Sequence, residues 1–135
     1  MKRYLGALIC LTIAGCLSVA AQADNPELLS ANIPSYPPLA RQARVCGAVK
    51  LAFTLPANAG EPANVEAVSG HPLLKSAALE NVRTWRFRNT YAVERRYETT
   101  FHYTLSETES RHVTFESFNV VEIVSPQPPP LDSNF

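Results

Sequence analysis

The chain has 135 residues, of which 46% are hydrophobic and 18% charged, and its formal net charge at pH 7 is zero. This length allows a single small domain with appendages and one modest core. Because the charges balance, there is no excess of basic residues of the kind that nucleic-acid binding requires, and we exclude nucleic acid as a partner.

Residues 1–23 have the pattern of a targeting segment. A charged start at Lys2 and Arg3 precedes a long apolar run, and the sequence Ala-Gln-Ala before Asp24 resembles a signal peptidase site. We therefore predict a cleaved signal peptide and a mature protein that works outside the cytoplasm.

Two other fates of this segment stay open. The sequence Ile-Ala-Gly-Cys that ends at Cys16 resembles a bacterial lipobox, in which residues 1–15 are removed and Cys16 becomes the lipidated first residue. The apolar run from Tyr4 to Ala21 is also within the spanning range of about 17–25 residues, so an uncleaved segment would anchor the chain in a membrane.

Residues 24–35 are a short polar leader into the domain. The next segment, residues 36–46, begins with two prolines suited to a first helical turn and continues with apolar residues at three- and four-residue spacing. This pattern predicts a helix that Gly47 ends, with Cys46 as a small buried residue at the helix terminus.

The following segments predict one sheet with helices on it. Residues 48–55 alternate apolar and polar side chains, and a turn rich in Pro, Asn and Gly leads to a second strand over 64–69. Pro72 then takes the first position of an amphipathic helix, and the longest alternation marks a third strand over 95–105. The order predicts an α+β domain, with two helices packed on one face of a small three-stranded antiparallel sheet.

The end of the chain differs in composition from this domain. Residues 106–125 join a polar connector to a stretch of strand composition, for which we predict an extra C-terminal strand or hairpin between Val113 and Val124. Residues 126–135 are a proline-rich tail.

No motif indicates catalysis or metal binding. The histidines, His71, His102 and His112, have no partners at metal-ligand spacing, and no nucleophile motif accompanies Cys46. We therefore predict that the chain is not an enzyme and has no catalytic residues, no metal and no cofactor, and that His71 is a helix-entry residue.

A basic cluster follows the second predicted helix. Its members are Arg83, Arg86, Arg88, Arg95 and Arg96. It either provides solubility and complements the helix dipole, or attracts an acidic segment, which would belong to a partner or to the C-terminal part of this chain.

Two groups of residues resemble the TonB C-terminal domain family. The first is a Tyr-Pro, Ala-Arg, Gly-x-Val opening, and the second combines Ser-Gly-x-Pro-x-Leu, Ala-Ala and Trp-x-Phe elements. The structural signature residues in this chain are Tyr36, Pro37, Gly47, Gly70, Pro72, Trp85 and Phe87. The resemblance covers residues 36–105 and implies two helices on one side of a three-stranded sheet.

The resemblance also implies a function and a site. In this family the domain works in the periplasm and binds outer-membrane transporters by pairing its last strand with an extended transporter segment. The implied partner is thus a protein or an extended peptide, such as a TonB-dependent transporter. The partner-binding residues would be Arg95, Arg96, Tyr97, Glu98, Thr99, Thr100, Phe101, His102 and Tyr103.

An alternative stays open beside this prediction. The chain would then be a structural or accessory envelope protein whose edge strand is covered by its own C-terminal extension. The sequence also leaves open a homodimer.

Overall fold

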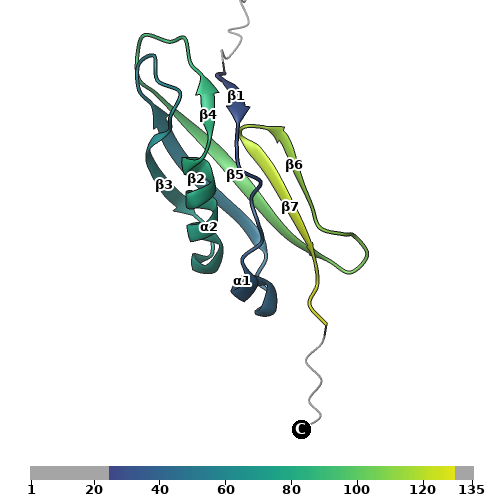
Figure 1. Ribbon diagram of the computed structural model, residues 1–135. Coiled ribbons are helices and arrows are strands. Elements are labelled where there is room, and N and C mark those ends of the chain that lie inside the picture. Colours follow the sequence, from purple (N-terminus) through teal and green to yellow (C-terminus); the bar gives the residue numbers. More distant parts are fainter. Residues whose placement is uncertain (1–24, 130–135) are drawn as a thin grey trace, which may run out of the picture.

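The computed structural model describes residues 25–129. The predicted signal peptide, the lipidation of Cys16 and the last residues of the tail lie outside this range. The elements are β1 (Glu27–Ser30), α1 (Pro38–Gln42), β2 (Gly47–Leu55), β3 (Ala63–Ser69), α2 (Pro72–Arg83), β4 (Arg86–Arg88), β5 (Arg95–Ser106), β6 (His112–Ser117) and β7 (Val120–Pro126), as Figure 1 shows. Among the described residues, none of these helices has the length and apolar character needed to cross a membrane.

The main sheet has five strands in the order β3-β2-β5-β7-β6. β2 pairs antiparallel with β3 and β5, whereas β7 runs parallel to β5 and antiparallel to β6. A second, two-stranded sheet joins β1 to β4. The α+β class with two helices is confirmed, but the predicted three-stranded antiparallel sheet is not: β6 and β7 extend it, and β7 makes it mixed.

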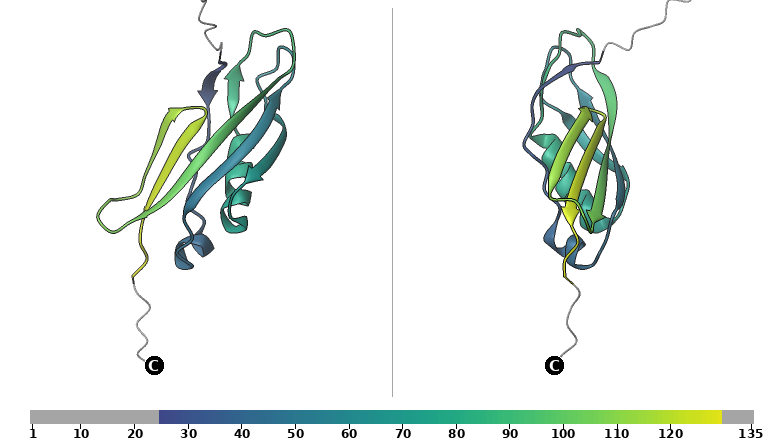
Figure 2. Two further views of the ribbon diagram at one scale, coloured as in Figure 1. Left: turned by 180° about the vertical axis from the view of Figure 1, so that it is seen from behind. Right: turned by 90° about the vertical axis from the view of Figure 1, so that its right-hand side faces the viewer.

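The helices and the leader lie on one side of the five-stranded sheet. Figure 2 shows the other side of the sheet from behind, where no helix of residues 25–129 covers it. Apolar side chains of alternate strand positions therefore face the helices, and polar ones face solvent. The leader contributes the short strand β1, which pairs with β4 beside the end of α2.

The core is a cluster of aromatic rings between the sheet and α2. The ring of Phe53 on β2 lies 6.1 Å from Trp85 and 5.6 Å from Phe87, measured between centroids. Trp85 is fully buried, and its indole N–H donates to Asn81 Oδ1 at 2.9 Å, so the polar atom of this large side chain is satisfied inside the core.

The C-terminal hairpin, which we define as β6 and β7, is part of this core. Phe118, between its strands, packs at 5.7 Å from Phe87 and 5.8 Å from Tyr97. Phe115 on β6 lies 6.2 Å from Trp85. The hairpin expected from the sequence therefore exists, and its aromatic side chains join those of the family-like segment.

The first helix ends earlier than the sequence predicted. Arg44 adopts a left-handed conformation with φ of 55°, and the Val45 N–H donates to the Ala40 carbonyl at 2.8 Å. These features form a Schellman-type cap, so the chain leaves the helix before Gly47, which instead begins β2. The early end also leaves Cys46 exposed, and the prediction of a buried cysteine is wrong.

The second helix begins as predicted. His71 is its N-cap, and the imidazole Nδ1 accepts from the Leu73 N–H at 3.1 Å, while Pro72 occupies the first turn. Gly70, just before it, has φ of 131°, and a Cβ there would lie 2.9 Å from Val49 Cγ2. Only glycine fits between this turn and β2.

Candidate protein-binding site

β5 crosses the middle of the sheet and contains all nine residues of the predicted site. Its side chains alternate between the two sides of the sheet. Thr99, Phe101 and Tyr103 are buried on the helix side. The side chains of Glu98 and His102 are exposed on the other side. A partner that recognised side chains of β5 would therefore contact only those on the side opposite the helices, such as Glu98 and His102.

The backbone of β5 is paired differently along its length. β2 pairs with residues 95–103 on one side, without a register shift. On the other side, β7 pairs with residues 100–106. The prediction that this strand is an edge is therefore wrong for residues 100–103, whose backbone already has a partner on each side. We call residues 95–99 the open half of β5 and residues 100–106 the covered half.

The open half directs two sets of backbone groups away from β2. The Thr100 N–H donates to the Asn119 carbonyl at 2.9 Å, so even-numbered residues of β5 direct their N–H and C=O groups toward the β7 side. Arg96 and Glu98 share this direction, and no strand of residues 25–129 lies opposite them on that side. These two residues offer four unpaired backbone groups.

The charged side chains of the open half are paired with neighbouring strands. Arg96 Nη2 lies 2.9 Å from Glu66 Oε1 on β3, and Lys50 Nζ on β2 lies 3.1 Å from Glu98 Oε2. Both pairs are about half exposed, so each contributes little to stability and can exchange with a charged ligand.

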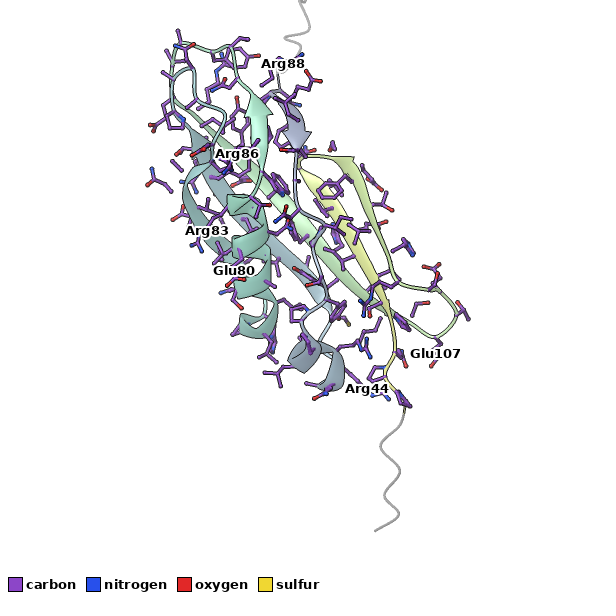
Figure 3. The ribbon with its side chains drawn as sticks, in the orientation of Figure 1. Arg44, Glu80, Arg83, Arg86, Arg88 and Glu107 are labelled. Carbon is purple, nitrogen blue, oxygen red and sulfur yellow. The ribbon has the colours of Figure 1, made fainter. Side chains whose placement is uncertain are left out.

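The basic cluster of the sequence is divided among α2, β4 and β5. Figure 3 labels Arg83 on α2 and Arg86 and Arg88 on β4. Arg88 Nη1 lies 2.9 Å from Glu27 Oε2 on β1, and Arg86 Nε lies 3.5 Å from Glu61 Oε1. Within residues 25–129, no ion pair joins these arginines to the acidic residues of the hairpin. Arg86 pairs instead with the loop before β3, and Arg88 pairs with β1 of the leader.

Several buried hydroxyl groups of β5 and β7 have no hydrogen-bond partner among the described residues. They are Tyr97 Oη, Thr99 Oγ1, Tyr103 Oη and Ser125 Oγ. Tyr36 differs, since its hydroxyl donates to the Val45 carbonyl. Burial, and then the neighbouring Cys46 thiol, raises the pKa of Tyr36 to about 12. Burial, and then Tyr36, raises the pKa of Tyr103 above the usual range.

A groove of about 460 Å³ lies between the leader and the C-terminal hairpin. Ile33, Pro34 and Tyr36 line one wall, and Val113 and Phe115 line the other. Ile33 is 80% exposed, which is high for a large apolar side chain. The groove is thus an apolar depression at the outer part of the sheet, away from the open half of β5.

The tail leaves the domain beside the end of α1. Arg44 Nη1 donates to Gln127 Oε1 at 3.0 Å, and its Nη2 donates to the Pro128 carbonyl at 3.3 Å. Figure 3 shows Arg44 and Glu107 at this end of the molecule. The tail is therefore held where β7 ends.

The described residues hold no group of three or more potential metal ligands. The three histidines lie on different elements: His71 caps α2, His102 is exposed on β5 and His112 begins β6. Sequence reasoning missed Asn119 and the parallel direction of β7, which decide what β5 leaves free. The strand composition of residues 120–124 was visible, but its pairing partner was not.

A family model described as Gram-negative bacterial TonB protein C-terminal matches residues 32–105. No curated protein matches the sequence. Among solved structures, the solution structure of the Pseudomonas aeruginosa TonB C-terminal domain is similar, with a TM-score of 0.53 and 22% sequence identity. The match covers 66% of this chain and 95% of that chain, and at this identity it supports the fold alone.

Proposed function

Because the chain belongs to the family of Gram-negative bacterial TonB protein C-terminal domains, we propose that it is a periplasmic protein-binding module of TonB-dependent transport. Its partner is an extended segment of an outer-membrane transporter, which pairs with the open half of β5. The observation that carries this proposal is the set of backbone groups on Arg96 and Glu98 that face no strand of residues 25–129, just before the start of β7.

The strength of such pairing follows from the number of hydrogen bonds. Four backbone bonds, each with a net contribution of about 1 kcal/mol, give about 4 kcal/mol, which corresponds to a dissociation constant of about 1 mM. Pairing at the open half alone is therefore weak. Side chains of the partner that replace the Arg96–Glu66 or Lys50–Glu98 ion pairs would add selectivity.

Displacement of β7 by a partner is a more costly route. It would expose Val121 and Ile123, which are buried, and would remove Phe118 from the aromatic core. Exposing such side chains costs about 1.5–3 kcal/mol each. A partner strand would have to recover this free energy before it gained any affinity, so we assign binding to the open half.

The test is a titration of the isotopically labelled protein with a synthetic peptide that carries the transporter-box sequence, followed by backbone amide resonances. We expect the largest shifts at Arg96 and Glu98, and smaller ones at residues 100–106. Glu98→Pro removes one outward N–H and should abolish the shifts. Glu98→Ala is the matched control, since it loses the same carboxylate but keeps the N–H. Equal binding by the two variants would exclude backbone pairing.

A second candidate is an accessory envelope protein whose edge is closed by its own extension. The pairing of β7 along residues 100–106 favours it. The same titration separates the two candidates, because a closed edge leaves the amide resonances of the open half unchanged at every peptide concentration.

A further inference from the structure

β6 is the outer edge of the five-stranded sheet, beyond β7 (Figure 1). Among residues 25–129 it pairs with β7 alone, so one side of its backbone has no strand partner. An edge of this kind accepts another strand unless a charge, a proline or a bulge blocks it. β6 contains no proline, and its one acidic residue, Glu116, lies at the register shift between Phe115 and Ser117, near the end of the strand. The middle of the strand, from Val113 to Phe115, is uncharged and pairs regularly with β7.

The direction of the free groups follows from the neighbouring ladder. The Thr100 N–H donates to the Asn119 carbonyl, so odd-numbered residues of β7 bond with β5 and even-numbered ones bond with β6. Thr114 lies opposite an even-numbered residue of β7 and bonds with it. Val113 and Phe115 therefore direct their N–H and C=O groups outward.

The sequence of β6 is complementary to itself. Antiparallel pairing about a twofold axis at Thr114 places Val113 opposite Phe115 of a second copy. It also places His112, next to Arg111, opposite Glu116 of that copy. Apolar residues thus meet apolar ones, and the basic start of the strand meets its acidic end, which are favourable cross-strand pairs.

The groove beside β6 extends this match. Val113 and Phe115 are only partly buried, although they lie on the helix side of the sheet and pack against the core. Their counterparts from a second copy would lie at the mouth of the groove, close to the exposed Ile33. Strand pairing would thereby cover apolar surface that one copy leaves accessible to water.

The other edge of the sheet, β3, lacks these properties. Asn64 has a left-handed φ of 51°, and the pairing of β3 with β2 contains two register shifts, so its edge is irregular. A twofold axis at the centre of β3 would also place Glu66 opposite Glu66, which is repulsive. The irregular, like-charged edge is the protected one.

We propose that the chain associates with a second copy of itself through antiparallel pairing of β6 with β6, about an axis at Thr114. The pairing strand β6 lies outside the family-matched residues 32–105, although Ile33 beside it lies within them. It leaves the open half of β5 free, so it is independent of the function proposed above.

Sedimentation velocity over a range of concentrations tests this proposal, with the protein as the expressing cell processes it. We expect a monomer–dimer equilibrium. Thr114→Lys places two ammonium groups opposite each other and should raise the dimer dissociation constant roughly tenfold or more. Thr104→Lys is the matched control, because it makes the same change at an exposed position on the inner strand β5 and should leave the constant unaltered.

A charge-swap pair distinguishes the interface from a general loss of folding. Thr114→Glu alone should also weaken the dimer, and an equimolar mixture of Thr114→Lys and Thr114→Glu should recover it as a heterodimer. The proposal is overturned if the unmodified chain stays monomeric, if Thr114→Lys dimerises like Thr104→Lys, or if the mixture recovers nothing.

Discussion

The two halves of β5 share one strand, yet they differ in what surrounds them. The covered half has β2 on one side and β7 on the other, whereas the open half has β2 alone. Both halves alternate inward and outward side chains in the same way, so their side-chain pattern is the same. The difference lies in the backbone, and it arises because β7 begins at Val120, opposite Thr100. The start of β7 thus decides which backbone groups of β5 have no neighbouring strand.

The largest effect should come from removing the C-terminal hairpin, whose strand β7 pairs with the covered half of β5. Deleting residues 107–135 exposes the covered half and removes several buried side chains from the core, at about 1.5–3 kcal/mol each. This sum is comparable to the whole stability of a small domain, which is about 5–15 kcal/mol. We expect loss of the cooperative thermal transition, measured by circular dichroism. An unchanged melting temperature would mean that the hairpin adds nothing to the core.

A substitution of one residue should weaken the packing of the C-terminal hairpin. Phe118→Ala removes a ring that contacts Phe53, Phe87 and Tyr97, and should lower the free energy of unfolding by about 3 kcal/mol. Denaturant titration measures this. Val93→Ala, at an exposed loop position, is the control and should change it by less than about 0.5 kcal/mol.

Amide hydrogen exchange should separate the two halves directly. Arg96 and Glu98 have no strand opposite their N–H groups, whereas Thr100 and His102 face β7. We expect exchange at least about a hundredfold faster for the first pair than for the second, because unbonded amides of an edge exchange without unfolding. Equal protection would indicate that another segment covers the open half.

High pH should reveal the buried tyrosines. The pKa of Tyr36 is raised from its ordinary value of 10.0 to about 12, and that of Tyr103 is raised as well. At a pH between the ordinary pKa and the raised pKa, the tyrosines of the unfolded chain release protons that the folded protein retains. The free energy of unfolding therefore falls as pH rises above about 10, and it is unaffected at lower pH. Tyr103→Phe should make this fall less steep in denaturant titrations. An equal slope would place Tyr103 in contact with water.

The smallest effect should come from an ion pair of the open half. Arg96→Ala removes the pair with Glu66, which is more than half exposed, and should lower the free energy of unfolding by about 0.5 kcal/mol or less. Denaturant titration with added salt as a second condition measures it. A loss above about 2 kcal/mol would mean that this ion pair organises the open half.

Local signals made much of the fold predictable from sequence. Alternation over residues 48–55 and 95–105, and the His71-Pro72 helix start, depend on neighbours along the chain, and these elements formed where expected. The predicted end of α1 was wrong, because Arg44 adopts the left-handed conformation that glycine usually adopts after a helix. β4 was missed, because three residues are too few to show a period.

The candidate site was harder to predict for a physical reason. Alternation reports which side chains are buried, but it carries no information about which strand lies beside which. β7 runs parallel to β5 because the chain first forms the outer strand β6 and then turns back between β6 and β5. This order is a property of the tertiary structure. The sequence therefore located β5 correctly while leaving its edge position undetermined.

The placement of Phe118 has a kinetic consequence. This residue comes late in the chain, yet it packs on Phe53 of β2 and Phe87 of β4, which both precede the hairpin by a long stretch of sequence. Contacts of such long sequence separation form slowly. During synthesis, the contacts of those earlier rings are therefore completed only after the end of the chain is made. In the interval before Phe118 docks, the rings are accessible to a protease or a chaperone.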